Sequence, residues 1–195
     1  MTDTEVIQVQ VFAGGDALLA HTPALRSVYA AAFCVPPWGE DEERATEFTD
    51  RLTADARRPG FGAALAFRAG ELLGFATGWI TPAPFPGDRC YPQVAAGLGP
   101  ERTADWLVGA LEIDELAVRP TARGTGTAEA LLRALTATAP GGRCWLLTSA
   151  QAPRAMSFYR RRGWTQATHP SPDGKGVVVF LGPGHPARAL AARPL

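Results

Sequence analysis

The chain has 195 residues, enough for one domain with a sizeable hydrophobic core. Its 19 basic residues equal its 19 acidic residues, so the formal net charge is zero, and no basic excess favours a nucleic acid or an anionic membrane as a partner. No apolar run approaches the roughly 20 residues that a helix needs to cross a bilayer.

We expect a cytoplasmic protein. The first residues are polar and lack a basic segment followed by an apolar stretch, so the sequence predicts no secretion signal. Cys34, Cys90 and Cys144 are an odd number of cysteines without metal-ligand spacing. This pattern indicates reduced thiols and no metal site.

Hydrophobic periodicity predicts strands and helices that alternate along the chain. In chain order we expect a strand at 6–12, a helix at 17–33 broken by Pro23, a helix at 40–57, strands at 62–68 and 72–80, a short helix at 100–110, a strand at 111–118, a helix at 126–137, a strand at 143–148, a helix at 153–162 and a strand at 176–181. This order predicts an α/β fold in which a mixed sheet carries helices on its faces.

Two segments fall outside this pattern, although we expect the whole chain, 1–195, to form a single domain. Prolines and glycines crowd residues 81–103, which predicts a long loop; with its flank we treat it as an insertion over 81–105. The end of the chain, about 183–195, is rich in proline, glycine and alanine and is expected to be loosely held.

The strand at 111–118 changes phase along its length. Leu111 and Ile113 place apolar side chains on one face, whereas Leu116 and Val118 have the opposite parity. One extra residue near 114–115 would restore the phase, so the pattern predicts a β-bulge there, a feature often found beside active sites. The alternative is a strand buried on both faces, which needs no bulge.

The turn that follows, residues 123–128, reads Arg-Gly-Thr-Gly-Thr-Ala. Glycines allow a ligand to approach the backbone closely, and free N–H groups at a helix start attract phosphate. A dinucleotide fingerprint would need a third glycine where Glu129 stands, and the Gly-Lys-Ser or Gly-Lys-Thr of a Walker loop is absent. Taken alone, this turn is a weak signal.

In its context the turn resembles the pyrophosphate-binding motif of the GNAT acetyltransferases. The family spacing Arg-x-x-Gly-x-Ala follows a Leu-x-Val strand, and the matching residues here are Leu116, Val118, Arg123, Gly126 and Ala128. A second segment, residues 155–164, reads Ala-Met-Ser-Phe-Tyr-Arg-Arg-Arg-Gly-Trp and resembles the family signature A-x-x-F-Y-x-x-x-G-F. The resemblance therefore implies the GNAT fold, a mixed, mostly antiparallel twisted sheet with helices on both faces and a bulge in its fourth strand.

The sequence departs from the family pattern in two places. An asparagine often found three residues before the matched Ala155 is Ala152 here, which implies the loss of one side-chain contact with the cofactor. The insertion over 81–105 replaces what is often a short hairpin, and we expect it to reshape the acceptor side.

The resemblance implies an enzyme that uses acetyl-CoA as a co-substrate and transfers the acyl group directly to a primary amine of a small molecule or peptide. The alternative is a non-catalytic acyl-CoA-binding module that regulates a partner. A homodimer is a candidate assembly, and we expect neither a nucleic acid nor a membrane as partner. The resemblance implies the following cofactor-binding residues: Leu116, Ala117, Val118, Arg123, Gly124, Thr125, Gly126, Thr127, Ala128 and Tyr159.

The catalytic residues are expected among carboxylates of the 111–118 strand and at one tyrosine. Glu112 is the favoured base because it lies four residues before Leu116, where histone-acetylating members of the family carry a glutamate. Asp114 is second and Glu115 third, and for each the alternative is a solvated or ion-paired carboxylate. Tyr159 matches the family's proposed general acid.

Acceptor residues in this family come from the first helix pair and nearby loops, and part of the expected set is aromatic. The expected substrate-binding residues are Phe33, Trp38, Glu40, Trp79 and Tyr91. The alternative is that these side chains are ordinary core and loop anchors.

Overall fold

The computed structural model describes residues 6–35, 39–170 and 176–191. Its strands are hydrogen-bonded in the order β1-β2-β3-β4-β5-β7-β6, and every neighbouring pair whose register is described is antiparallel except β4 with β5. The predicted α/β fold with a mixed, mostly antiparallel sheet is therefore confirmed. Within the described residues, no helix is long and apolar enough to cross a membrane.

The chain divides into two compact units, of which the first comprises Met1–Trp79 and Glu115–Ala137 and the second Ile80–Asp114 and Thr138–Leu195. The division falls within β4 (Leu111–Val118), between Asp114 and Glu115. The β-bulge expected at this point and the single domain expected for the chain stay predictions.

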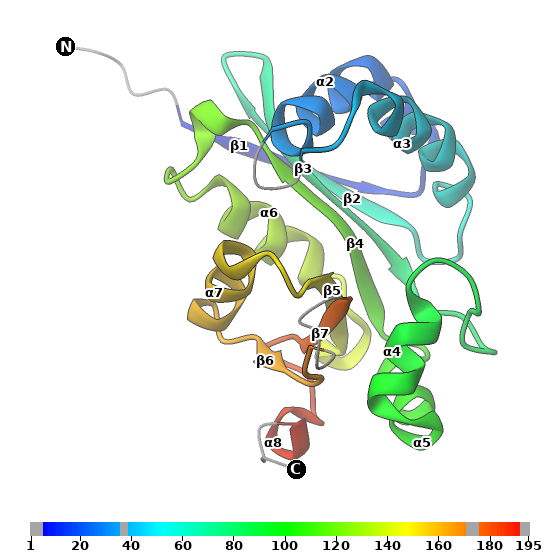
Figure 1. The fold of residues 1–195 in the computed structure, drawn as a ribbon. Coiled ribbons are helices and arrows are strands. Elements are labelled where there is room, and N and C mark those ends of the chain that lie inside the picture. The colour runs from blue at the N-terminus through cyan, green and yellow to red at the C-terminus, as the bar shows by residue number, and fades with distance from the viewer. Residues whose placement is uncertain (1–5, 36–38, 171–175, 192–195) are drawn as a thin grey trace. The chain divides into compact units, whose positions relative to one another are not determined.

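In the first unit, helices cover both faces of an antiparallel sheet (Figure 1). Its elements are β1 (Gln8–Ala13), α1 (Asp16–Leu19), α2 (Thr22–Phe33), α3 (Glu42–Asp55), β2 (Gly62–Arg68), β3 (Glu71–Ile80, ending one residue beyond the unit) and α6 (Thr127–Thr136). Helices α2 and α3 pack together on one face, and α6 lies on the other (Figure 1). The predicted break near Pro23 is confirmed, because Pro23 stands in the first turn of α2, where its missing N–H needs no partner.

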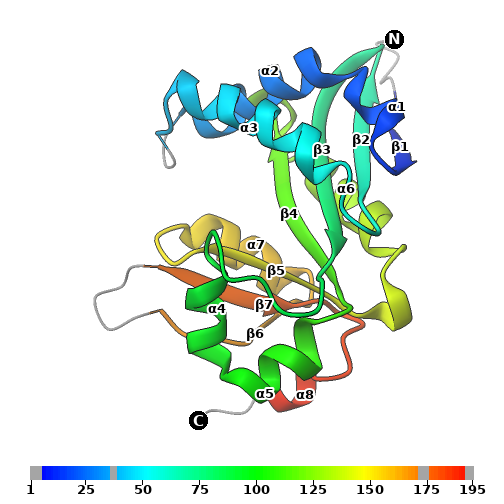
Figure 2. The ribbon, with the colours of Figure 1, turned by 90° about the vertical axis from the view of Figure 1, so that its right-hand side faces the viewer.

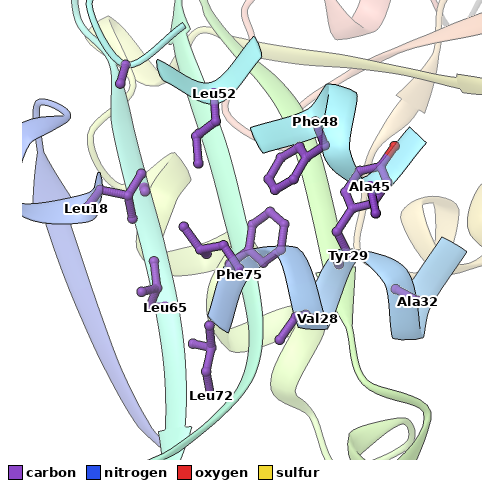
Figure 3. Close-up of a cluster of buried hydrophobic side chains, with 14 of the residues drawn as sticks. Leu18, Val28, Tyr29, Ala32, Ala45, Phe48, Leu52, Leu65, Leu72 and Phe75 are labelled. Carbon is purple, nitrogen blue, oxygen red and sulfur yellow. The ribbon is translucent and has the colours of Figure 1, made fainter. Parts of the chain in front are cut away.

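The core of this unit lies between the α2–α3 pair and the sheet (Figure 3). Phe48 stacks on Tyr29 with ring centroids 4.4 Å apart and on Phe75 at 5.4 Å. Leu65 and Phe75 are fully buried, so alternate residues of β2 and β3 point into this cluster, which we call the α2–α3 cluster.

In the second unit, helices also lie on both faces of the strands β5 and β7 (Figure 2). Its further elements are α4 (Tyr91–Leu98), α5 (Pro100–Arg102), a π-helical turn (Thr103–Leu107), β5 (Cys144–Ser149), α7 (Pro153–Arg161), β6 (Thr165–Gln166), β7 (Val177–Leu181) and α8 (Arg188–Ala191). Tyr159 of α7 packs against Phe180, whereas Val94 of α4 clusters with Trp145 and Val179 on the opposite face.

The long loop predicted over 81–103 is wrong where α4 forms, whereas the short helix predicted at 100–110 is confirmed by α5 and the π-helical turn that follows it. Tyr91, Val94 and Leu98 recur at helical spacing and are all buried, and Pro92 stands in the first turn, where a proline is tolerated. The high proline and glycine content concealed this amphipathic pattern.

The segment after Gly182 contacts the second unit as far as it is described. His185 is buried, its Nε2 lies 2.8 Å from the carbonyl oxygen of Trp106, and its Nδ1 accepts a hydrogen bond from the amide of Ala187 at 3.1 Å. These bonds hold the start of the tail against the second unit's own core, and the loose tail expected over about 183–195 stays a prediction.

Candidate functional site

The turn between β4 and α6 exposes backbone at the start of a helix. Gly124 and Gly126 have φ values of +79° and +84°, which L-residues with a side chain rarely adopt, and a Cβ added at either position would meet no atom within 4 Å. Gly126 is the N-cap of α6, so the first N–H groups of that helix have no intrahelical partner. The turn is thus an exposed stretch of backbone that can accept an anion.

Side chains around this turn fix its shape. The hydroxyl of Thr125 donates to the carbonyl of Ala122 at 2.8 Å and lies 2.7 Å from the hydroxyl of Thr127, which is buried. The guanidinium of Arg123 donates to the carbonyl of Ala32 at the end of α2, at 3.4 Å. Ala128, the small residue expected in the motif, lies half-buried in the first turn of the helix.

The second half of β4 runs close against β3 because Gly74 has no side chain. A Cβ at Gly74 would lie 2.7 Å from the carbonyl oxygen of Ala117 and 3.0 Å from Cγ2 of Val118. Ala117 is buried in the α2–α3 cluster, whereas Leu116 and Val118 are half-buried and alternate with it. Of the three residues expected to hold a ligand's arm, Leu116 and Val118 therefore keep part of their surface accessible, whereas Ala117 does not.

The favoured base, Glu112, is buried in the second unit. Its side chain is enclosed, with only 4% of the residue exposed, and its Oε2 accepts a hydrogen bond from the hydroxyl of Tyr91 at 2.8 Å. It lies opposite Trp145 in the parallel pairing of β4 with β5. We expected Tyr91 among the substrate-binding residues, and in the structure its hydroxyl is hydrogen-bonded to the candidate base.

The other two candidate bases form ion pairs. Asp114 accepts from the guanidinium of Arg89 at 3.2 Å, and Glu115 accepts from that of Arg51 on α3 at 2.9 Å. The side chains of Asp114 and Glu115 are 17% and 16% exposed, so both pairs are shielded from water more than an ordinary surface pair. The ion-pair alternative that we kept open for these carboxylates is thus observed for both.

Tyr159, the expected general acid, lies on α7. Its ring packs between Trp164 at 5.9 Å and Phe180 at 5.8 Å, and 9% of the residue is exposed. The helix ends as the sequence predicts, because Gly163 follows it with a φ of +78°. Ala152 caps α7 without a side-chain hydrogen bond, at the position where the family pattern often has an asparagine.

The expected acceptor residues that the structure describes lie in different surroundings. Phe33 packs on the ring of Tyr29 at 4.7 Å, and the hydroxyl of Tyr29 donates to Oε2 of Glu40 at 2.8 Å. Trp79 is fully buried in the α2–α3 cluster, so contact with an acceptor would require this packing to open. Trp38 lies outside the described residues.

Tyr29 is held protonated by its surroundings. Its burial, the nearby charge of Glu115 and the hydrogen bond to Glu40 together raise the pKa of the Tyr29 hydroxyl well above its usual range. Sequence reasoning missed Tyr29, Arg51 and Arg89 because their links to the carboxylates join residues that are distant in the chain. Among the described residues, no group of three or more His, Cys, Asp or Glu side chains could hold a metal ion.

The exposed turn at the start of α6 thus follows a strand that carries the buried Glu112, on an α/β fold. A model of the acetyltransferase (GNAT) family matches residues 24–164, which is most of the chain. The chain therefore belongs to the GNAT acetyltransferase family, whose acyl donor is acetyl-CoA.

Solved structures of acetyltransferases share this fold. They include an acetyltransferase from Thermus thermophilus (TM-score 0.59, 15% identity, covering 91% of this chain and 98% of that one), the PaiA N-acetyltransferase from Thermoplasma acidophilum in complex with coenzyme A (0.56, 14%, 89% and 98%) and the ribosomal-protein-S18-alanine N-acetyltransferase from Escherichia coli (0.53, 17%, 91% and 95%). Among curated proteins, none matches the sequence. Identities this low support the fold alone.

Proposed function

We propose that the protein is an N-acetyltransferase that transfers the acyl group of acetyl-CoA directly to a primary amine of a small molecule or peptide. The observation that carries this proposal is the open turn at Gly124 and Gly126, whose positive φ values present bare backbone at the start of α6. A cytoplasmic location and a homodimer remain predictions.

The residues of the turn fit the pyrophosphate of coenzyme A. Backbone N–H groups from Arg123 to Ala128 would hold the phosphates, since an anion at a helix N-terminus is stabilised by both hydrogen bonds and the helix dipole. No side chain at Gly124 or Gly126 obstructs the approach. Backbone groups of Leu116, Ala117 and Val118 would hold the pantetheine arm, and the Val118 amide would polarise the acyl carbonyl.

Bound acetyl-CoA supplies a thioester, whose carbonyl carbon is open to attack by an amine. A free amine is mostly protonated at neutral pH, with a pKa near ~10, so a base must take a proton before attack. Glu112 would accept that proton, and the amine nitrogen would bond to the acyl carbon as the carbon–sulfur bond breaks. Tyr159 would donate its hydroxyl proton to the leaving thiolate.

The acceptor would be recognised by residues of the first helix pair. Phe33 offers an aromatic surface, and the half-buried Glu40 offers a carboxylate to a cationic amine. One of the structural relatives is, by its name, a ribosomal-protein-S18-alanine N-acetyltransferase, so a peptide amine belongs in the screen.

The test is acetyl-CoA turnover with three kinds of amine: tryptamine, spermidine and a lysine-containing peptide. Release of free thiol, together with a mass gain of one acetyl group on the amine, is the expected result. Binding of acetyl-CoA in calorimetry without acetylation of any amine would favour the non-catalytic alternative. Absence of heat with both acetyl-CoA and coenzyme A would overturn the proposal.

A further inference from the structure

The segment over 81–105 contains Tyr91, whose hydroxyl is hydrogen-bonded to the candidate base, Glu112. Helix α4 begins at Tyr91, and Pro92 in its first turn fixes the backbone there. Only 1% of Tyr91 is exposed. Its hydroxyl is 2.8 Å from Oε2 of Glu112, which fits a strong hydrogen bond from a neutral donor to a carboxylate.

The ring of Tyr91 is held in place by two other aromatic side chains. Phe85 meets it edge-on with ring centroids 5.2 Å apart, and Trp145 of β5 lies 6.4 Å away. Phe85 and Trp145 are themselves 6.2 Å apart, so the three rings form a closed contact set. Packing of this kind leaves the phenol few alternative orientations and fixes where its proton points.

Each of the three candidate bases has a described hydrogen bond or ion pair. Asp114 and Glu115 are each bonded to a guanidinium, whereas the phenol of Tyr91 is a neutral donor to Glu112. The hydrogen bond from Tyr91 is thus a contact through which the segment over 81–105 reaches a candidate base.

Other charged groups of the second unit lie near this pair. Asp114 stands two residues further along β4, Arg89 pairs with it from the loop before α4, and the carbonyl of Asp88 accepts from the amide of Tyr91. The residue of β5 opposite Glu112 is Trp145, which does not titrate. Any pH dependence assigned to Glu112 must be read together with Arg89, Asp88 and Asp114.

We propose that Tyr91 is a positioning residue that fixes the Glu112 carboxylate as the proton acceptor. The segment over 81–105 thereby takes part in catalysis, through Glu112, besides shaping the acceptor side. This inference rests on the proposed function. It predicts an effect on turnover and on its pH dependence that packing alone would not produce.

The experiment compares Tyr91→Phe with Thr81→Val in acetyl-CoA turnover with the best amine of the three tested. Thr81→Val is the matched control, because it removes a buried hydrogen bond of the same unit, from Trp145 Nε1 to Thr81 Oγ1 at 2.7 Å. Tyr91→Phe should lower kcat about tenfold with little change in KM, in line with the loss of one hydrogen bond to a charged group. The acidic limb of its pH–rate profile should move to higher pH, because the lost bond favoured the ionised carboxylate.

Thr81→Val should destabilise the fold but leave the pH–rate profile in place. The inference is overturned if Tyr91→Phe keeps the wild-type kcat and profile, or if Thr81→Val moves the profile as far. Coupling between Tyr91 and Glu112 is measured apart from activity, by a double-mutant cycle of Tyr91→Phe and Glu112→Gln on the free energy of unfolding. Zero coupling overturns the inference whatever the acceptor, whereas clear coupling in a wild-type protein that acetylates no amine overturns the proposed function.

Discussion

The turn at residues 123–128 and the carboxylate of Glu112 are built in opposite ways. The turn is exposed and made of backbone, and its shape follows from two glycines close together in the chain. Glu112 is buried, and its surroundings come from side chains about twenty residues or more away, Tyr91 above all. The difference teaches that a binding surface made of backbone is encoded locally, whereas the environment of a catalytic side chain is encoded by tertiary packing.

The largest effect is expected from a variant that blocks the exposed backbone of the turn at residues 123–128. Gly126→Glu places a side chain and a negative charge where the phosphates are proposed to bind, at a φ of +84°. We expect calorimetry to detect no binding of coenzyme A, because the carboxylate repels the phosphates and takes their place at the helix start.

Gly70→Glu is the control for this variant. Gly70 lies in the turn between β2 and β3 with a φ of +79°, and a Cβ there would meet no atom within 4 Å. Both variants should lose stability by a similar amount, about 1–2 kcal/mol for a side chain in the left-handed region. Coenzyme A affinity that survives in Gly126→Glu would mean that the pyrophosphate binds elsewhere.

The next largest effect is expected from variants that distinguish Glu112 from Asp114 as the catalytic base. Glu112→Gln should lower kcat about 10²-fold to 10⁴-fold, the range expected for loss of a general base, and leave coenzyme A affinity near the wild-type value. Asp114→Asn should lower kcat by a much smaller factor, because Asp114 is paired with Arg89. Steady-state kinetics of both variants, with calorimetry for the cofactor, measures the difference. Equal losses, or a larger loss for Asp114→Asn, would assign the base to Asp114.

Features that depend only on residues close together in the chain could be predicted from the sequence. The alternation of strand residues, the glycines of the turn and the glycine that ends α7 predicted the sheet, the exposed backbone and the helix boundary. Helix α4 was missed because proline and glycine content outweighed the spacing of Tyr91, Val94 and Leu98. That spacing, together with a proline in the first turn, was the signal that could have revealed it.

The environment of the carboxylates could not be predicted in the same way. The ion pair between Arg51 and Glu115 joins residues 64 positions apart, and that between Arg89 and Asp114 joins residues 25 positions apart. No periodicity or motif links such residues, because their proximity follows from helix packing on a sheet rather than from local backbone geometry. The roles of Glu112, Asp114 and Tyr159 therefore stay predictions that kinetics must test.

The smallest effect is expected at a second hydrogen bond between a phenol and a carboxylate. This bond is as long as the one between Tyr91 and Glu112, so the two can be compared directly. Tyr29 donates to Glu40 at 2.8 Å in the first unit, and the pKa of Tyr29 is raised above its usual value near 10, first by burial. The native protein therefore keeps a proton that the unfolded chain loses above about pH 10. Its free energy of unfolding must then fall as pH rises beyond that value.

Tyr29→Phe should cost about 1 kcal/mol at neutral pH, for the lost hydrogen bond, and should reduce the alkaline slope of the free energy of unfolding. Urea unfolding at pH values from about 7 to about 11 measures both quantities. Burial raises the pKa of the Cys144 thiol to about 12, and this adds an alkaline slope to both proteins, so the difference between them isolates Tyr29. Identical slopes would show that the Tyr29 hydroxyl ionises as readily in the native state as in the unfolded chain, and its bond to Glu40 would then differ in kind from the one that fixes Glu112.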